Sequence, residues 1–97
     1  MKIDLKKENE NLIIALEGRL DTNTAGDLEI KLDELKDITH LTLDLDKLDY
    51  ISSAGLRVLL SFQKLMNSKG EMELVNVNQN IMDIFEVTGF SDILNIK

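Results

Sequence analysis

Cysteine, proline and tryptophan are absent from this 97-residue chain, and histidine occurs once, at His40. Without cysteine the chain forms no disulfide, no thiolate metal site and no cysteine nucleophile. A single histidine leaves little basis for a zinc site or for a histidine-based catalytic relay. The sequence therefore favours a binding or signalling module over an enzyme.

Long apolar runs and clusters of basic residues are also lacking. No stretch approaches the ~20 apolar residues that cross a bilayer, and the alternating residues 2–6 are unlike a secretion signal. With 18 acidic and 11 basic residues the net charge is −7, which argues against binding nucleic acid and favours a basic protein surface. We expect a cytoplasmic domain with no membrane span and no direct contact with nucleic acid.

Candidate metal and catalytic motifs do not meet the requirements of their chemistry. A calcium loop starting at Asp44 would need glycine at the position of Asp49 and a bidentate glutamate at that of Gly55. His40 lies in a polar connection with no indicated triad partner, and no glycine-rich phosphate loop is present. The sequence predicts no metal, no cofactor and no catalytic residue.

Hydrophobic periodicity predicts strands that alternate with helices. The expected strands are residues 2–7, 12–16, 41–45 and 72–77, and the expected helices are 25–35, 54–68 and one from Asn78 or Asn80 to Gly89. Residues 91–97 fit either a short helix or a strand. Since residues 12–16 are continuously apolar, we expect that strand to be covered on both faces.

The order of these elements predicts a fold class. A polar turn at residues 8–11 indicates a hairpin between the first two strands, and Gly70 is expected at the left-handed position that ends the second helix. Strands that alternate with helices form mainly parallel sheets. The prediction is one α/β domain over residues 1–97, with a mixed, mainly parallel sheet of four to five strands, an antiparallel edge strand and helices packed on it.

Two consecutive serines precede the second predicted helix. Either Ser52 or Ser53 can cap that helix by accepting a hydrogen bond from a first-turn amide. The same position has free amides and positive potential, so it also tolerates a phosphoryl group. A capping serine and a phosphoacceptor are compatible roles.

The segment Tyr50–Leu56 resembles the phosphoacceptor loop of STAS domains, the family of bacterial anti-sigma factor antagonists. In that family the loop reads aromatic, apolar, Asp, Ser, Ser or Thr, Gly, Leu, and the serine directly after the Asp is phosphorylated. Aligning Gly55-Leu56 with the family's Gly-Leu puts Ser52 in place of the Asp. The resemblance thus implies that Ser53 is the phosphoacceptor.

Two further segments extend the resemblance over effectively the whole chain. Gly18–Asp21, followed by Thr24-Ala25, is similar to the family's Gly-x-Leu/Ile-Asp and Thr-Ala segment that enters the first helix. Phe85–Phe90 is similar to its closing Phe-x-x-Thr/Ser-Gly-Leu/Phe. The motifs follow in the family's order, so the resemblance implies the STAS fold.

The resemblance also implies a partner-switching cycle. The unphosphorylated domain would bind an anti-sigma factor that is also an ATP-dependent serine kinase, and so free a sigma factor for transcription. Phosphorylation of Ser53 would separate the complex, and a serine phosphatase would reset it; ATP and magnesium belong to the partner. The residues expected at the contact are Asp21, Thr22, Thr24, Ser52, Ala54, Gly55, Leu56 and Arg57.

Two departures from the family pattern keep alternatives open. Ser52 replaces the family's Asp, and Arg57 replaces a common small residue. Arg57 could pair with a phosphate on Ser53, contact the partner, or be a solvated surface residue. A rival function is a STAS scaffold that never cycles phosphate, in a stress-sensing assembly or a lipid-transport complex; a small enzyme has little support.

Overall fold

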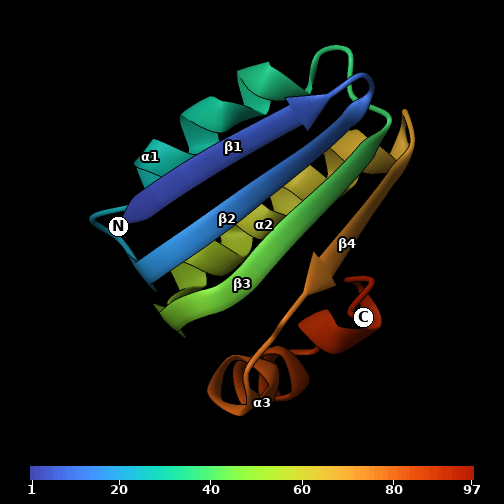
Figure 1. The fold of residues 1–97 in the computed structure, drawn as a ribbon. Helices are drawn as coiled ribbons and strands as arrows, with labels where there is room; N and C mark the ends of the chain where they lie inside the picture. Colours follow the sequence, from blue (N-terminus) through green and yellow to red (C-terminus); the bar gives the residue numbers. More distant parts are fainter.

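The computed structural model describes all 97 residues as a four-stranded sheet with helices on one side (Figure 1). In chain order the elements are β1 (Lys2–Glu8), β2 (Asn11–Leu20), α1 (Ala25–Glu29), the 3₁₀ helix η1 (Ile30–Leu35), β3 (His40–Ile51), α2 (Ser53–Asn67), β4 (Glu71–Val75), α3 (Gln79–Thr88) and the 3₁₀ turn η2 (Phe90–Asp92). The strand order is β1-β2-β3-β4; β1 is antiparallel to β2, and the other neighbours are parallel.

This topology confirms the predicted α/β fold with an antiparallel edge strand. The sheet has four strands, and the C-terminal segment adds only an isolated bridge between Leu74 and Ile96. The segment after α3 is therefore a 3₁₀ turn followed by one bridge residue. The sequence left a short helix or a strand open here, and the structure has a short piece of each.

The helices cover only one face of the sheet, so the prediction that β2 is covered on both faces is wrong. Leu12, Ile14 and Leu16 are buried, but Ile13 between them is 42% exposed. Side chains alternate across a strand, and Ile13 points to the open face beside Lys6 and Thr42 of the adjacent strands. A single exposed isoleucine among polar neighbours is tolerated at a protein surface.

Strand β3 extends six residues beyond its predicted end at Leu45, as far as Ile51. Its register with β2 shifts between Ala15 and Glu17 and again between Gly18 and Arg19, so β3 carries extra residues at both points. The buried side chains consequently fall at Leu45, Leu48 and Ile51, three residues apart. These bulges hide the two-residue period of the strand from sequence analysis.

The predicted helix over residues 25–35 is helical but changes type. Helix α1 ends at Glu29 and continues as the 3₁₀ helix η1. Leu28 and Leu35 are fully buried, and Leu32 packs against the core. Because a 3₁₀ helix has three residues per turn, Leu32 and Leu35 share its inner face.

The two glycines at helix ends have different roles. Gly89 has φ +83 and ends α3 in the left-handed conformation, as predicted. The same prediction for Gly70 is wrong: α2 ends at Ser68 in right-handed geometry, and Gly70 lacks a positive φ. A Cβ at Gly70 would lie 1.9 Å from the Thr39 carbonyl oxygen. Close backbone contact is therefore the reason for glycine there.

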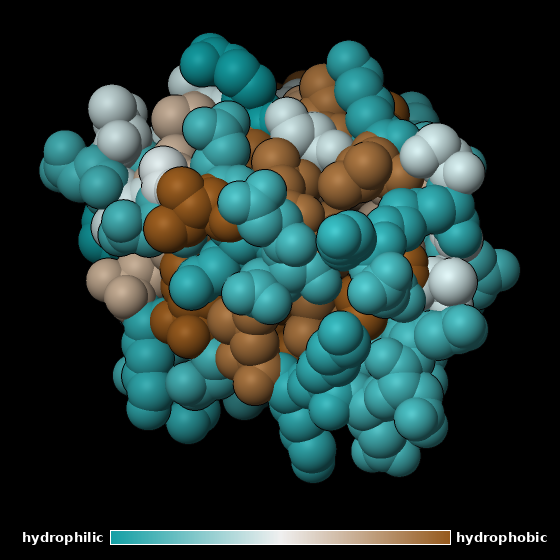
Figure 2. Space-filling view, turned by 90° about the horizontal axis from the view of Figure 1, so that it is seen from above, coloured by the Kyte–Doolittle hydropathy of each residue, from teal (hydrophilic) through white to brown (hydrophobic).

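The core contains 23 buried hydrophobic residues, of which only Phe62 and Phe85 are aromatic. Seen from above, the surface shows brown apolar areas separated by teal hydrophilic side chains (Figure 2). Exposed apolar groups thus lie among hydrophilic neighbours on this side of the molecule. None of the helices has the length and apolarity needed to cross a bilayer.

Candidate functional site

The two serines before α2 have different environments. Ser52 has extended backbone geometry and is the N-cap of α2: its Oγ accepts from the Gly55 amide at 3.5 Å, and its carbonyl accepts from the Leu56 amide at 2.9 Å. Ser53 is the first residue of the helix, and its side chain is exposed. The Ser53 hydroxyl has no hydrogen bond to the rest of the chain. Capping is therefore the role of Ser52, and the hydroxyl of Ser53 is available to react.

The corner after β2 lies next to this loop. Leu20 and Ile51 are paired at the ends of two parallel strands, and the Ser52 amide donates to the Leu20 carbonyl at 2.9 Å. Asp21 directly follows the end of β2, and Ser52 directly follows the end of β3. The structure therefore brings together the two segments that the family resemblance put at the contact.

The Asp21 corner is held by its own hydrogen bonds. The Asp21 carboxylate accepts from the amides of Asn23 at 3.0 Å and Thr24 at 3.3 Å. The Thr24 hydroxyl accepts from the Asp21 amide at 2.9 Å and donates to the Arg19 carbonyl at 2.7 Å. Thr22 lies between them, exposed, at the tip of the turn. Asp21 and Thr24 thus fix the corner, and Thr22 is the member of the predicted contact set that faces solvent there.

These hydrogen bonds shift the ionisation of Asp21. Partial desolvation would raise the pKa of its carboxyl group, but hydrogen bonds from the Asn23 amide and from the hydroxyl and amide of Thr24 stabilise the carboxylate. The Arg19 guanidinium, 3.6 Å from the carboxylate, adds a favourable charge. Together they hold the pKa of Asp21 below its ordinary value, so the corner carries a negative charge at neutral pH.

Gly55 packs the start of α2 against the end of β2. A Cβ at Gly55 would lie 2.7 Å from Leu20 Cγ, 2.8 Å from the Leu20 carbonyl oxygen and 2.9 Å from Ile51 Cγ1. Gly55 and Leu56 are both buried, so their part in a contact surface is to set the position of the exposed residues beside them. Ala54 is half-buried and Arg57 is exposed.

A shallow pocket lies beside Ser53. Its lining consists of Ser53, Leu56, Arg57 and Leu60 from α2 with Thr88 and Phe90 from the end of α3 and η2. Arg57 is the one charged residue among them. Sequence analysis used the segment containing Thr88 and Phe90 only as a fold motif and missed this position, because spacing along the chain does not show which distant segments meet.

Arg19 and Tyr50 are a second pair that sequence analysis missed. They are partners across the β2–β3 ladder, and the Arg19 guanidinium lies 4.3 Å from the centroid of the Tyr50 ring. Such a cation–π contact, together with the ion pair to Asp21, links the corner to the strand that carries the serines. The aromatic residue of the loop motif therefore holds the neighbouring strand end in place.

A second pocket lies on the open face of the sheet, and most of its lining is charged. Ion pairs lie along it, Lys2 with Asp4 at 3.9 Å and Lys47 with Glu17 at 3.9 Å. Opposite charges there neutralise one another in solvent, where such pairs contribute little. No group of three or more His, Asp or Glu side chains is arranged to hold a metal ion.

The fold and the serine loop define a class of protein. The STAS domain family model matches residues 2–97, and the chain belongs to that family. Several relatives carry the name anti-sigma factor antagonist. BtrV of Bordetella bronchiseptica, named as an anti-sigma factor antagonist, is 37% identical over 99% of this chain and 85% of its own length.

A second relative and a solved structure extend the comparison. The anti-sigma F factor antagonist of Paenibacillus polymyxa is 31% identical, over 99% of this chain and 86% of its own. The solved structure of the Bacillus cell fate determinant SpoIIAA in its phosphorylated form has a TM-score of 0.76 and 18% identity, covering 99% of this chain and 91% of that one. At that identity the structural likeness concerns the fold.

Proposed function

We propose that this domain is an anti-sigma factor antagonist switched by phosphorylation of Ser53. Unphosphorylated, it binds an anti-sigma factor that is also a serine kinase and thereby frees a sigma factor. The observation that carries the proposal is the Ser53 hydroxyl, exposed and without a hydrogen bond at the first turn of α2. Relatives named anti-sigma factor antagonists support the role. SpoIIAA, which shares this fold, has been solved in a phosphorylated form, and this supports a phosphorylated state.

The modification is a phosphoryl transfer with a simple balance. A bond forms between Ser53 Oγ and the γ-phosphorus of ATP, and the bond from that phosphorus to the β,γ-bridging oxygen breaks. ADP leaves, and the hydroxyl proton passes to a base of the kinase or to water. A serine phosphatase reverses the change by hydrolysis, which restores the hydroxyl and releases inorganic phosphate. The kinase supplies ATP and Mg²⁺, and the domain is its substrate.

Charge explains how the modification separates the complex. A phosphoryl group adds roughly −1.5 to −2 charges at pH 7, on a chain whose net charge is already −7. An interface formed around a neutral hydroxyl would have to desolvate that charge, which costs several kcal/mol unless a cation of the partner meets it. The start of α2 itself tolerates the anion because the helix dipole is positive there.

The replacement of the family's Asp by Ser52 is the feature that favours a scaffold that never cycles phosphate, but it does not disturb the start of α2. The family's Asp is replaced, yet Asp and Ser are about equally good N-caps, and Ser52 does cap α2. The backbone at the phosphoacceptor is therefore set by the same kind of contact. What the replacement removes is one negative charge beside Ser53.

The test is intact-mass measurement after incubation with Mg²⁺-ATP and a purified anti-sigma serine kinase from the same genome. We expect one added phosphoryl group, lost in Ser53→Ala and kept in Ser52→Ala. In addition, Ser53→Asp should bind the kinase more weakly while its melting temperature stays near that of the wild type. Folded protein that gains no mass with any such kinase would favour the scaffold instead.

A further inference from the structure

The two arginines of this chain are Arg19 and Arg57, and they differ in their surroundings. Arg19 forms an ion pair with Asp21 and lies over the Tyr50 ring. Arg57 is exposed, and its guanidinium takes part in none of the ion pairs of the structure. It lines the pocket beside Ser53, where it is the one charged group. Resting on the proposed function, we propose that Arg57 is the intramolecular partner of the phosphoryl group on Ser53.

Helix geometry brings the two side chains within reach. Ser53 and Arg57 are four residues apart on α2, so they lie one above the other on the same face, with Cβ atoms about 5–6 Å apart. An arginine offers a planar fork of N–H donors that matches two phosphate oxygens at once, unlike the point charge of a lysine. The guanidinium can therefore bind the phosphoryl group without any change in the backbone.

The pocket strengthens this pair relative to one on an open helix surface. Leu56, Leu60 and Phe90 form its apolar lining, and Leu56 is only 6% exposed. An apolar wall excludes water on one side of the ion pair, which lowers the effective dielectric constant and reduces screening by salt. No carboxylate lines the pocket to compete with the phosphoryl group for Arg57.

This pairing gives the switch a second effect. Before phosphorylation Arg57 presents a free positive charge beside an uncharged serine. Afterwards the guanidinium is bound to the phosphoryl group, so a partner's carboxylate would lose a cation while the surface becomes more negative. The phosphorylated domain stays folded with its new charge held against α2. No bond of Arg57 changes, and it keeps its proton throughout.

The experiment places phosphoserine at position 53 of the full chain during translation, so that no kinase is needed. The ³¹P resonance is then titrated against pH in the wild type, Arg57→Gln and Arg57→Lys. We expect Arg57→Gln to lower the second acid dissociation constant of the phosphoserine roughly threefold, so that its titration moves to higher pH. The reason is that the dianion loses the cation that stabilises it. Arg57→Lys should restore part of this difference, since it keeps the charge but not the fork.

Lys64→Gln provides the matched control. Lys64 is exposed on the same helix, about 16 Å from Ser53 along the helix axis at 1.5 Å per residue, and its loss changes the net charge equally. Its titration should follow that of the wild type. The proposal is overturned if Arg57→Gln titrates like the wild type, or if Lys64→Gln shifts the curve as much.

The two proposals can fail independently. A titration shift specific to Arg57 in a domain that no kinase modifies would keep the pairing and reject the proposed switch. Phosphorylation of Ser53 with no effect of Arg57→Gln on the titration would keep the switch and reject the pairing. In that second case weaker binding of unphosphorylated Arg57→Gln to the kinase would assign Arg57 to the interface alone.

Discussion

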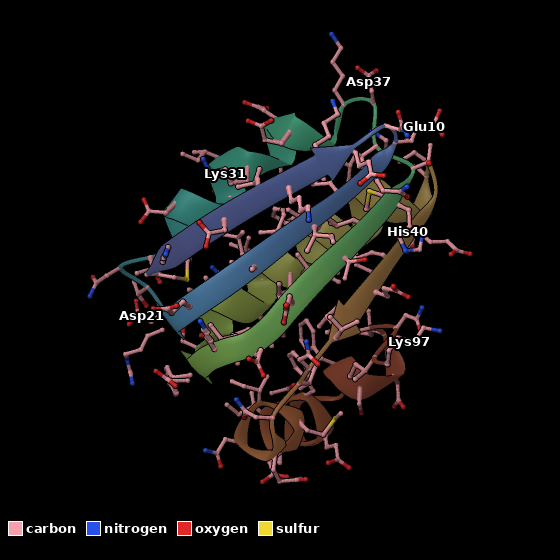
Figure 3. The ribbon with its side chains drawn as sticks, in the orientation of Figure 1. Glu10, Asp21, Lys31, Asp37, His40 and Lys97 are labelled. Carbon is pink, nitrogen blue, oxygen red and sulfur yellow. The ribbon has the colours of Figure 1, made fainter.

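The two ends of the sheet differ in the contacts that hold them together. At the end marked by Glu10 and His40 in Figure 3, the Glu10 carbonyl accepts from the Thr39 and His40 amides. The Thr39 carbonyl in turn accepts from the Glu71 amide at 2.9 Å. The Lys69 ammonium donates to the carbonyls that end η1. This end is closed by its own contacts.

The opposite end, marked by Asp21 in Figure 3, has an equally fixed backbone but unused side chains. The Leu20 carbonyl accepts from the Ser52 amide, and Asp21 holds its turn with two amides. The Ser53 hydroxyl and the Arg57 guanidinium nevertheless have no partner within the chain. A rigid backbone that presents unpartnered polar groups is suited to contact another molecule, which is why the two ends should respond differently to mutation.

The largest effect on stability is expected at the closed end, from Gly70→Ala. Its Cβ would lie 1.9 Å from the carbonyl oxygen of Thr39, which is backbone and cannot rotate away. We expect a loss of about 3 kcal/mol, at the upper end of the usual cost of overpacking, because the contact is with backbone. Urea denaturation measures it.

Gly26→Ala is the control for Gly70→Ala. Gly26 lies in α1 with nothing within 4 Å of a Cβ, so alanine there should stabilise by about 0.5–1 kcal/mol through helix propensity. If Gly70→Ala were as stable as the wild type, the close approach of Gly70 to the Thr39 carbonyl would not be what requires glycine at this position.

A smaller loss is expected from Gly55→Ala at the site end. A Cβ there would lie 2.7–2.9 Å from its three nearest atoms, further than the 1.9 Å at Gly70, but these atoms belong to the buried residues Leu20 and Ile51 and one is a backbone carbonyl oxygen. Alanine also gains helix propensity, so we expect a net loss of about 1–2 kcal/mol. Hydrogen exchange should localise the damage to the first turn of α2; exchange that rises equally throughout the protein would contradict it.

The next prediction concerns how the stability contributed by Asp21 depends on pH. The folded-state pKa of Asp21 is lowered from 3.8, so its carboxylate stabilises the fold above that pH and loses this contribution as pH falls through the folded-state value. Asp21→Asn should therefore be less stable than the wild type at pH 7, and the difference should shrink below about pH 4. Denaturation curves at both pH values measure it.

Asp33→Asn serves as the matched control for Asp21→Asn. Asp33 is exposed in η1 and makes no ion pair, while its loss changes the net charge equally. Its effect should be small at both pH values. A pH-dependent difference as large as that of Asp21→Asn would assign the effect to general charge repulsion instead of the corner.

Sequence analysis predicted the fold well because the hydrophobic pattern is regular where it matters. Leu12, Ile14 and Leu16 keep the strand period, and Gly89 ends its helix as expected. The continuous apolar run of β2 wrongly indicated cover on both faces, since Ile13 is exposed. The pattern also failed where backbone irregularity intervened, at the β3 bulges and at Gly70. In both places a tertiary contact, not a local preference, decides the geometry.

The candidate site divides in the same way. Ser53 and the Asp21 corner were reached through motifs that are local in sequence, and the ladder pairing of Leu20 with Ile51 then accounts for their proximity. Phe90, Thr88 and the Arg19–Tyr50 contact were not found, because they depend on how α3 and two strand ends meet in space. Only the folded chain holds that information.

The smallest effects on stability are expected from the serines themselves, and their order is informative. Ser52→Ala removes the N-cap of α2 and should cost about 0.5–1 kcal/mol, at the low end for a cap because the hydrogen bond is long at 3.5 Å. Ser53→Ala removes an exposed hydroxyl with no partner, so its effect should stay within about 0.5 kcal/mol. Thermal melts of both variants under identical conditions decide the order. If Ser53→Ala were the more damaging, Ser53 would be the cap, and a charge placed there would disturb the helix as well as the interface. If the order holds, the residue proposed to carry the switch contributes almost nothing to the fold, and phosphorylation can change binding while leaving stability nearly untouched.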